Sequence, residues 1–287
     1  MRTEAVTSAQ NAKVKNLLLL QEKSKARREQ GLFVVEGRRE VEHCLSAGFV
    51  PRTLFLCDTI LPDSDREALS AQAERLNPQC TFVSLPETLY RKVAYREGTE
   101  GVIAEVRYRE RTLEDLVLSD HPLIVVLEAV EKPGNLGAVL RSADAARADA
   151  VILCDPLTDL YNPNLIRASL GALFTVPTVA AASGEVITWL RARGIRILTA
   201  QLQDSEWYYD TDMQGGTALV LGTESTGLTD RWRQAADAHI RIPMLGRLDS
   251  LNVSVSAAIL LFEAVRQRHT APGAPSSTAL LPSSTTR

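Results

Sequence analysis

Five short apolar runs in the C-terminal half of the chain constrain its fold more than any other feature. They lie at 123–128, 150–154, 195–201, 218–221 and 240–242. Their apolar residues follow one another rather than alternating with polar ones, which is typical of strands buried on both faces of a parallel sheet. Helical patterns fall between or after the runs, at 136–148, 164–174, 185–193, 230–236 and 252–268. This alternation predicts an α/β domain that binds its ligand at the carboxyl ends of the strands.

A second alternating series precedes the first. Strands are expected at 32–35, 53–57, 81–85 and 101–106, and helices at 38–47, 65–75 and 87–93. An earlier amphipathic pattern predicts a helix over 11–29, begun by Ser8. We therefore expect a small α/β domain at 1–110, a charged linker at 111–120, and the parallel-sheet domain at 121–270. Residues 271–287 are mostly Ala, Pro, Gly, Ser and Thr, and we expect this tail to be disordered.

Composition and charge exclude several classes of protein. No apolar run approaches the roughly 20 residues that cross a bilayer, and the N-terminus lacks the apolar stretch of a signal peptide, so we expect a cytoplasmic protein without a membrane. The four cysteines and four histidines are scattered, with no spacing typical of a metal site or a hydrolytic triad. We expect no metal, and reduced cysteines in the core.

The net charge of −3 argues against a protein that coats RNA by charge alone. Residues 13–39 are different, because they hold eight basic residues and only three acidic ones. The segment is either an RNA-binding surface or a solvated helix face, and its sequence favours neither. The candidate RNA-binding residues are Lys23, Lys25, Arg27, Arg28 and Arg38.

Three segments that follow predicted strands carry residues suited to chemistry. In the first, 134–141, a glycine-bracketed turn leads into a helix and carries Asn135 and Arg141. The second, 222–227, is a glycine-bracketed loop with one carboxylate, Glu224. The third, 242–259, brings Ser250 and Asn252 to the start of a helix rich in small residues. Each segment alone is equally consistent with ordinary turn and helix-cap chemistry.

Taken together, these segments resemble the SpoU (TrmH-like) family of the SPOUT RNA methyltransferases. The family motifs are matched in order by N-x-G-x-x-x-R at 135–141, G-x-E at 222–224, and I-P-M followed by S-L-N-V-S-V at 242–255. The resemblance covers about 123–268. One departure is that the family loop commonly reads Glu-Gly-x-Gly, where this chain has Glu-Ser-Thr-Gly at 224–227. The first block is similar, more loosely, to the small RNA-binding domain often fused to this family, through Val-Val-Glu-Gly at 34–37.

The resemblance implies a deep trefoil knot in the parallel-sheet domain, a homodimer formed through that domain, and S-adenosylmethionine as the methyl donor. The residues that it implies for the donor pocket are Thr199, Ala200, Gly222, Ile242, Met244, Leu251 and Ser256. Those that it implies for catalysis are Asn135, Arg141, Glu224, Ser250 and Asn252, with one of them reaching in from the partner subunit.

The implied reaction is 2′-O-methylation of a ribose in structured RNA, and 23S rRNA is the favoured substrate. A tRNA 2′-O-methyltransferase and a catalytically silent RNA-binding protein are the alternatives. Methylation of a base nitrogen fits the Ser250 and Asn252 segment less well, and a dinucleotide oxidoreductase lacks its glycine fingerprint. The arginine-rich composition is typical of actinomycetes, in which an avilamycin-type resistance methyltransferase is one candidate. The sequence leaves open the nucleotide modified, the biological role, and the group that takes the 2′-hydroxyl proton.

Overall fold

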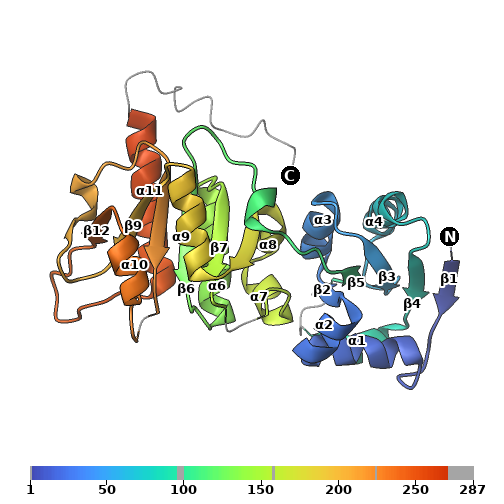
Figure 1. Ribbon diagram of the computed structural model, residues 1–287. Coiled ribbons are helices and arrows are strands. Elements are labelled where there is room, and N and C mark those ends of the chain that lie inside the picture. Colours follow the sequence, from blue (N-terminus) through green and yellow to red (C-terminus); the bar gives the residue numbers. More distant parts are fainter. Residues whose placement is uncertain (1, 96–99, 157–158, 224, 271–287) are drawn as a thin grey trace. The chain divides into compact units, whose positions relative to one another are not determined.

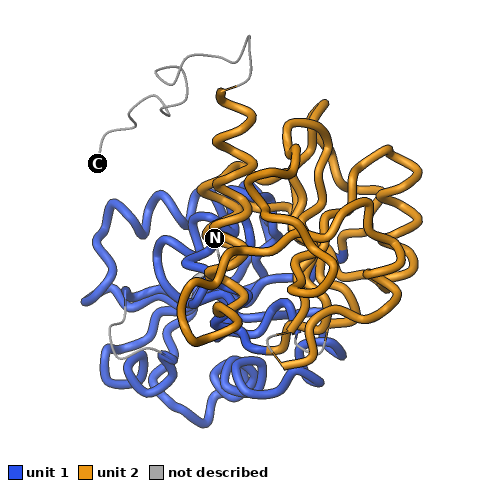
Figure 2. Tube along the Cα trace, turned by 90° about the vertical axis from the view of Figure 1, so that its left-hand side faces the viewer, with its two compact units in different colours: residues 1–110, 132–137, 158–175 blue, residues 111–131, 138–157, 176–287 orange. Residues whose placement is uncertain are grey.

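A computed structural model describes residues 2–95, 100–156, 159–223 and 225–270. The chain forms two compact units (Figure 2). The first contains residues 1–110 together with two later segments, 132–137 and 158–175. The second contains 111–131, 138–157 and 176–287. The predicted tail at 271–287 lies outside the described residues.

The first unit is built on a mixed five-stranded sheet in the order β1-β4-β3-β5-β2. Its strands are β1 (Arg2–Ala5), β2 (Leu32–Glu36), β3 (Pro51–Leu56), β4 (Thr81–Ser84) and β5 (Val102–Arg107). Strands β1, β4 and β3 run parallel, and β5 pairs antiparallel with both β3 and β2. The helices before residue 110 are α1 (Ala12–Glu22), α2 (Ser24–Gln30), α3 (Arg38–Ser46), α4 (Asp63–Leu76) and α5 (Glu87–Val93). The prediction of a small α/β unit is confirmed.

The predicted helix at 11–29 is wrong in two respects. It is divided into α1 and α2 at Lys23, whose φ of −108° and ψ of 108° are extended. Asn11, and not Ser8, caps α1, because its side-chain oxygen accepts the backbone N–H of Lys13 at 2.8 Å. Strand β1 was not predicted, because four residues are too few to show a period.

Segment 158–175 completes the core of the first unit. It carries two short helices, α7 (Pro163–Ala168) and α8 (Ala172–Thr175), where the sequence predicts one. The interruption falls at Leu170 and Gly171, which have φ of 51° and 85°. The ring of Phe33 on β2 stacks on Tyr161 of this segment with centroids 4.2 Å apart. The later segment is thus part of the first unit's aromatic core.

The second unit is built on a seven-stranded, entirely parallel sheet in the order β10-β12-β9-β11-β6-β7-β8 (Figure 1). Its strands are β6 (Leu123–Glu128), β7 (Ala150–Cys154), β8 (Thr178–Ala181), β9 (Arg196–Ala200), β10 (Glu206–Trp207), β11 (Thr217–Leu221) and β12 (Ala238–Arg241). Its helices are α9 (Ser183–Ala192), α10 (Asp230–Ala235) and α11 (Val253–Thr270), while α6 (Pro133–Ala145) begins in the first unit and continues in the second.

The apolar runs predicted as doubly buried strands are confirmed, since every residue of β6, β7 and β11 is buried. Helices α9 and α10 pack on one face of this sheet, where Trp232 is fully buried. Helix α11 contacts β11 and β6. Strands β8 and β10 were missed because they are short and carry few large apolar residues. The sequence therefore predicted the centre of the sheet and missed both of its edges.

The segment expected as a linker packs on the second unit. A short 3-10 turn, η1 (Leu113–Asp115), is held by Asp115 Oδ2, which accepts from the backbone N–H and the hydroxyl of Thr112 at 2.8 Å each. Leu113, Leu116 and Leu118 then lie against the core of that unit.

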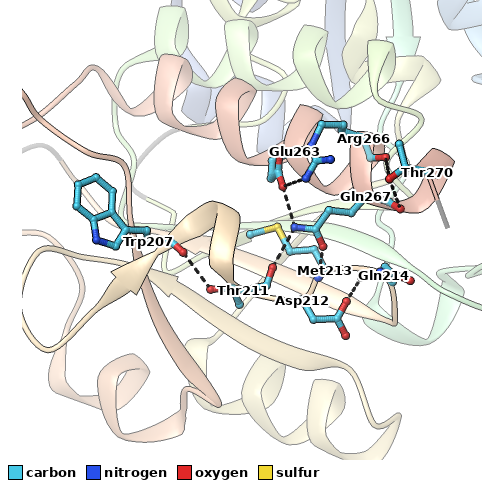
Figure 3. Close-up of polar contacts among 9 residues, drawn as sticks. All are labelled: Trp207, Thr211, Asp212, Met213, Gln214, Glu263, Arg266, Gln267 and Thr270. Carbon is cyan, nitrogen blue, oxygen red and sulfur yellow. Dashed lines mark hydrogen bonds and ion pairs between the residues drawn. The ribbon is translucent and has the colours of Figure 1, made fainter.

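Polar contacts fix the C-terminal half of α11 (Figure 3). Gln267 Oε1 accepts the N–H of Met213 at 2.8 Å, and its Nε2 donates to the carbonyl of Thr211 at 3.0 Å. Arg268 donates to four backbone carbonyls, those of His121, Pro122, Met213 and Gly215. Burial lowers the pKa of the Arg268 guanidinium. These contacts anchor the helix whose other end borders the candidate site.

The four cysteines are free and buried, as predicted, and burial raises the pKa of Cys80 and of Cys154 to about 12. Among the described residues, no helix has the length and apolar character needed to cross a membrane.

Candidate functional site

A cavity of about 370 Å³ opens where β9 and β11 end in the second unit. Its walls come from three segments: 200–203 after β9, the described residues 221–223 and 225–228 after β11, and 249–256 before and within α11. A smaller pocket of about 130 Å³ adjoins it and is lined in addition by Ile240, Ile242, Met244 and Leu260. The site thus lies at the carboxyl edge of the parallel sheet, where the sequence predicted a ligand.

The loop after β11 is folded tightly on itself, and Gly222 makes this possible. A Cβ at Gly222 would lie 2.3 Å from the carbonyl carbon and oxygen of Gly227. The loop closes through a bridge between Thr223 and Gly227, in which the Gly227 N–H donates to the Thr223 carbonyl at 3.0 Å. Gly227 has φ of 66°, which a residue without Cβ adopts readily. Any side chain at position 222 would open this wall of the cavity.

A buried carboxylate holds the far end of the same loop. Glu128, at the end of β6, is 5% exposed and accepts both the N–H and the hydroxyl of Thr229, at 2.8 and 2.7 Å. Thr229 directly precedes α10, which carries Arg233 into the cavity wall. Glu128 is therefore a positioning residue for the loop and for α10.

The third wall is the start of α11. Asn252 Oδ1 accepts the N–H of Ser254 at 3.0 Å and its hydroxyl at 2.6 Å, so Asn252 caps the helix. Ser250, two residues earlier, is exposed and lines both the cavity and the adjoining pocket. The structure thus separates two residues that the sequence grouped: Ser250 faces the site, and Asn252 shapes its wall.

Most of the residues predicted for the donor pocket come together. Ala200, Gly222, Leu251 and Ser256 line the cavity, and Ile242 and Met244 line the adjoining pocket. Thr199 is an exception, because its side chain is fully buried and its hydroxyl is 2.6 Å from Nδ1 of His239. Successive residues of a strand point to opposite faces, so Thr199 and its neighbour Ala200 differ in this respect.

The first motif is arranged differently from the prediction. Helix α6 begins at Pro133, so Asn135 lies within its first turn and not before it. Six residues of an α-helix advance by about 600°, which places Asn135 and Arg141 about 120° apart around the axis. The two side chains therefore leave the helix in different directions. Arg141 is exposed and does not line the cavity. Glu224 lies outside the described residues.

The structure also divides the basic residues of the first unit. Lys23, Lys25, Arg28 and Arg38 are exposed, as a nucleic-acid surface requires. Arg27 is 2% exposed, so its prediction as an RNA contact is wrong. Its Nε donates to Asp159 Oδ2 at 2.7 Å, and its Nη1 donates to the carbonyl of Leu20 at 2.7 Å. The guanidinium is thus part of the interior of the unit.

Among the residues of the cavity wall that sequence reasoning missed are Gln201, Arg233 and Asp249. Gln201 directly follows β9, so its place at a strand end was a usable signal. Asp249 is next to Ser250. Arg233 lies in a predicted helix whose apolar period gave no sign that it faces a ligand.

The cavity suits a small polar molecule. Its volume is in the range of ligand sites. The amide oxygen of Gln201 and Nε of Arg233 are buried without a hydrogen-bond partner, and both residues line the cavity. Unpaired buried polar atoms cost free energy unless a ligand or water satisfies them. In the described part of the chain, no group of three His, Cys, Asp or Glu residues is placed to hold a metal ion.

Comparison with known families gives two matches. Residues 122–262 match the SpoU rRNA methylase family, and residues 11–104 match the MRM3-like substrate-binding domain.

Individual relatives match over nearly the whole chain. A 23S rRNA (uridine(2479)-2′-O)-methyltransferase of Streptomyces viridochromogenes is 32% identical over 91% of this chain and 92% of its own length. The 23S rRNA (guanosine(2553)-2′-O)-methyltransferase RlmP of Bacillus subtilis is 31% identical over 90% of this chain and 97% of its own. The crystal structure of the SpoU methyltransferase AviRb from Streptomyces viridochromogenes, in complex with the cofactor AdoMet, superposes with a TM-score of 0.81 at 30% identity. It covers 91% of this chain and 100% of that chain.

Proposed function

Because this chain belongs to the SpoU rRNA methylase family, we propose that it transfers the methyl group of S-adenosylmethionine to a ribose 2′-oxygen of 23S rRNA. The observation that carries this proposal is the cavity itself. Two of its three walls belong to the segments that hold the second and third family motifs, the other wall follows β9, and all three meet at the carboxyl edge of the parallel sheet. The enzyme works in the cytoplasm, where its RNA substrate is found.

The donor supplies an already activated methyl group, so the protein has mainly to align the ribose with it and help the 2′-hydroxyl lose its proton. Ser250, which is exposed at the cavity, positions the ribose beside the donor. Arg141 binds the 3′-phosphate and stabilises the developing alkoxide, because a guanidinium stays protonated and is a poor base. Full activity of Arg141→Lys would rule out this planar, two-pronged contact.

The active form is a homodimer that pairs through the second unit, with a trefoil knot in that unit. Helix α11 supports the dimer, since its Val255 and Phe262 are 46% and 49% exposed and lie seven residues apart, on one face. Arg141 then reaches the cavity from the partner subunit. Phe262→Glu should convert the dimer to a monomer in light scattering and abolish methyl transfer.

The modified nucleotide must be found by experiment, because relatives of nearly equal identity are named for different nucleotides, a uridine and a guanosine. The similarity to the Streptomyces viridochromogenes enzyme supports a role in resistance to an avilamycin-type antibiotic.

The test is methyl transfer from labelled donor to deproteinised 23S rRNA, 16S rRNA and tRNA, followed by primer extension at limiting nucleotide concentration. We expect one new stop in 23S rRNA, with no label in the other RNAs. Label in tRNA alone would replace the ribosomal assignment, and donor binding without transfer to any RNA would indicate a silent RNA-binding protein. Drug sensitivity of cells with and without the gene separates resistance from housekeeping.

A further inference from the structure

Two side chains that line the cavity of the second unit each have a buried polar atom without a hydrogen-bond partner. Six side-chain atoms in the described residues are buried without a hydrogen-bond partner. Of these, only the amide oxygen of Gln201 and Nε of Arg233 belong to residues that line the cavity. The amide nitrogen of Gln201 is already engaged, since it donates to the carbonyl of Gln203 at 2.9 Å. What remains is one acceptor and one donor without partners.

The two side chains lie in chemically different parts of the site. Gln201 lines both the cavity and the adjoining pocket, whose wall includes the apolar side chains of Ile240, Ile242 and Leu260. Arg233 lines the cavity but not the adjoining pocket, and the wall there also carries the hydroxyls of Thr223, Ser225 and Thr226. A flat, weakly polar ring system fits the apolar part, and a charged group fits the part beside Arg233.

The charged residues of the cavity wall also favour an anionic group beside Arg233. Among the described residues that line the cavity, the charged ones are Arg233 and Asp249; the adjoining pocket shares Asp249 and is also lined by Arg241. Among the described residues, the ion-pair partner of Arg233 is Asp230, with Nη1 to Oδ1 at 3.8 Å, and that carboxylate is exposed. A guanidinium in this position is available to pair with an anion, because planar forks match carboxylates well.

We propose that Arg233 binds the carboxylate at the amino-acid end of the methyl donor, and that Gln201 accepts a hydrogen bond from its nucleoside end. This inference rests on the proposed function, and it assigns the donor's orientation: nucleoside toward the adjoining pocket, amino-acid end toward α10.

Binding calorimetry with two probes tests it. S-adenosylmethionine and its decarboxylated analogue share the nucleoside, the sulfonium and an ammonium group, and differ only in the carboxylate. We expect the full-length protein to bind the complete donor at least tenfold more tightly than the analogue. Arg233→Met should remove that difference by weakening the complete donor alone, and should raise KM for the donor with little change in kcat. Gln201→Met, similar in volume, should weaken both probes about equally.

Arg231→Met is the matched control, since Arg231 lies on the same helix, is exposed and does not line the cavity. Thermal unfolding of each variant identifies a simple loss of fold. If Arg233→Met weakens both probes equally, or neither, the carboxylate assignment is overturned; if Gln201→Met leaves both affinities unchanged, the nucleoside assignment is overturned. Failure of the unaltered protein to bind either probe would instead contradict the proposed function.

Discussion

The two units use the α/β arrangement in different ways. The second unit has an entirely parallel sheet, so its strand ends gather at one edge and leave a cavity of about 370 Å³ between three loops. In the first unit, β5 runs antiparallel between β3 and β2, and its buried charges are satisfied internally. Its exposed cations include Lys25 and Arg28 on α2 and Arg38 on α3. The comparison teaches that an entirely parallel sheet leaves a cavity between its strand ends, whereas the mixed sheet of the first unit belongs to a unit that pairs its buried charges internally and keeps its other cations on the surface.

The largest effect that tests this contrast is expected at the buried ion pair of the first unit. Arg27→Met leaves Asp159 buried without its partner, and such losses cost about 3–5 kcal/mol. Urea unfolding measures the change in stability. Lys25→Met, at a side chain that is 81% exposed, is the control and should change stability by less than about 0.5 kcal/mol. Normal stability of Arg27→Met together with weakened RNA binding would return Arg27 to the RNA surface.

The next effect concerns the enclosed cavity. Gly222→Ala places a Cβ 2.3 Å from the Gly227 carbonyl, so the loop must move. We expect donor affinity to fall by about 2–3 kcal/mol, roughly 30- to 150-fold, in calorimetry. Gly246→Ala is the control, because nothing lies within 4 Å of its added Cβ. Equal donor affinities in the two variants would show that the tight loop is not needed for binding.

A smaller effect is expected on the charged surface. Replacing Lys25 and Arg28 with Gln should weaken RNA binding, and the dependence of log K on log salt should become shallower by about 1 for each phosphate that the protein no longer neutralises. Stability and donor binding should stay unchanged. An unaltered salt slope would mean that these residues form only a solvated helix face.

The smallest expected effect is a change in the pH dependence of stability, and it concerns one of two buried carboxylates. Glu128 of the second unit accepts two hydrogen bonds from Thr229. Glu105 of the first unit accepts a hydrogen bond from Asn16, but its burial has the larger effect and raises the pKa of its carboxyl group. Folded protein therefore holds the Glu105 proton more tightly than unfolded protein does. Its contribution to stability is present at low pH and is lost as pH rises above the ordinary value of 4.5 and through the raised pKa. Glu105→Gln should flatten stability over this range, and an unchanged pH profile would contradict the assignment.

The sequence predicted what depends on local pattern. The doubly buried strands β6, β7 and β11 and the small-residue start of α11 all have strong local signals. Gly222 and Ser250 were placed correctly at the site because they follow or precede such elements. Arg27 and Thr199 were predicted at the surface or at the pocket, but their side chains are buried. A shift of a single position along a helix or strand changes the face on which a side chain lies, and sequence periodicity does not locate a face to one residue.

Contacts between residues that are distant in sequence could not be predicted. Nothing near Arg27 indicates that its partner is Asp159, 132 residues later. Likewise, Arg233 reaches the cavity because Glu128 fixes the residue before its helix, and that pairing joins positions 101 residues apart. Local sequence specifies elements, while the wall of a site is chosen by how those elements pack.

Phe33 contacts Tyr161, and Arg27 pairs with Asp159, although both pairs are far apart in sequence. This separation has a consequence for folding during synthesis. A ribosome delivers residues in order, and N-terminal domains generally fold first during synthesis. Here the first unit lacks its charge partner and part of its aromatic core until residues 158–175 have emerged. By then the first strands of the parallel sheet have already been translated. The first unit therefore cannot complete its folding before synthesis of the second unit has begun. A nascent chain stalled near residue 110 should remain a target for chaperones.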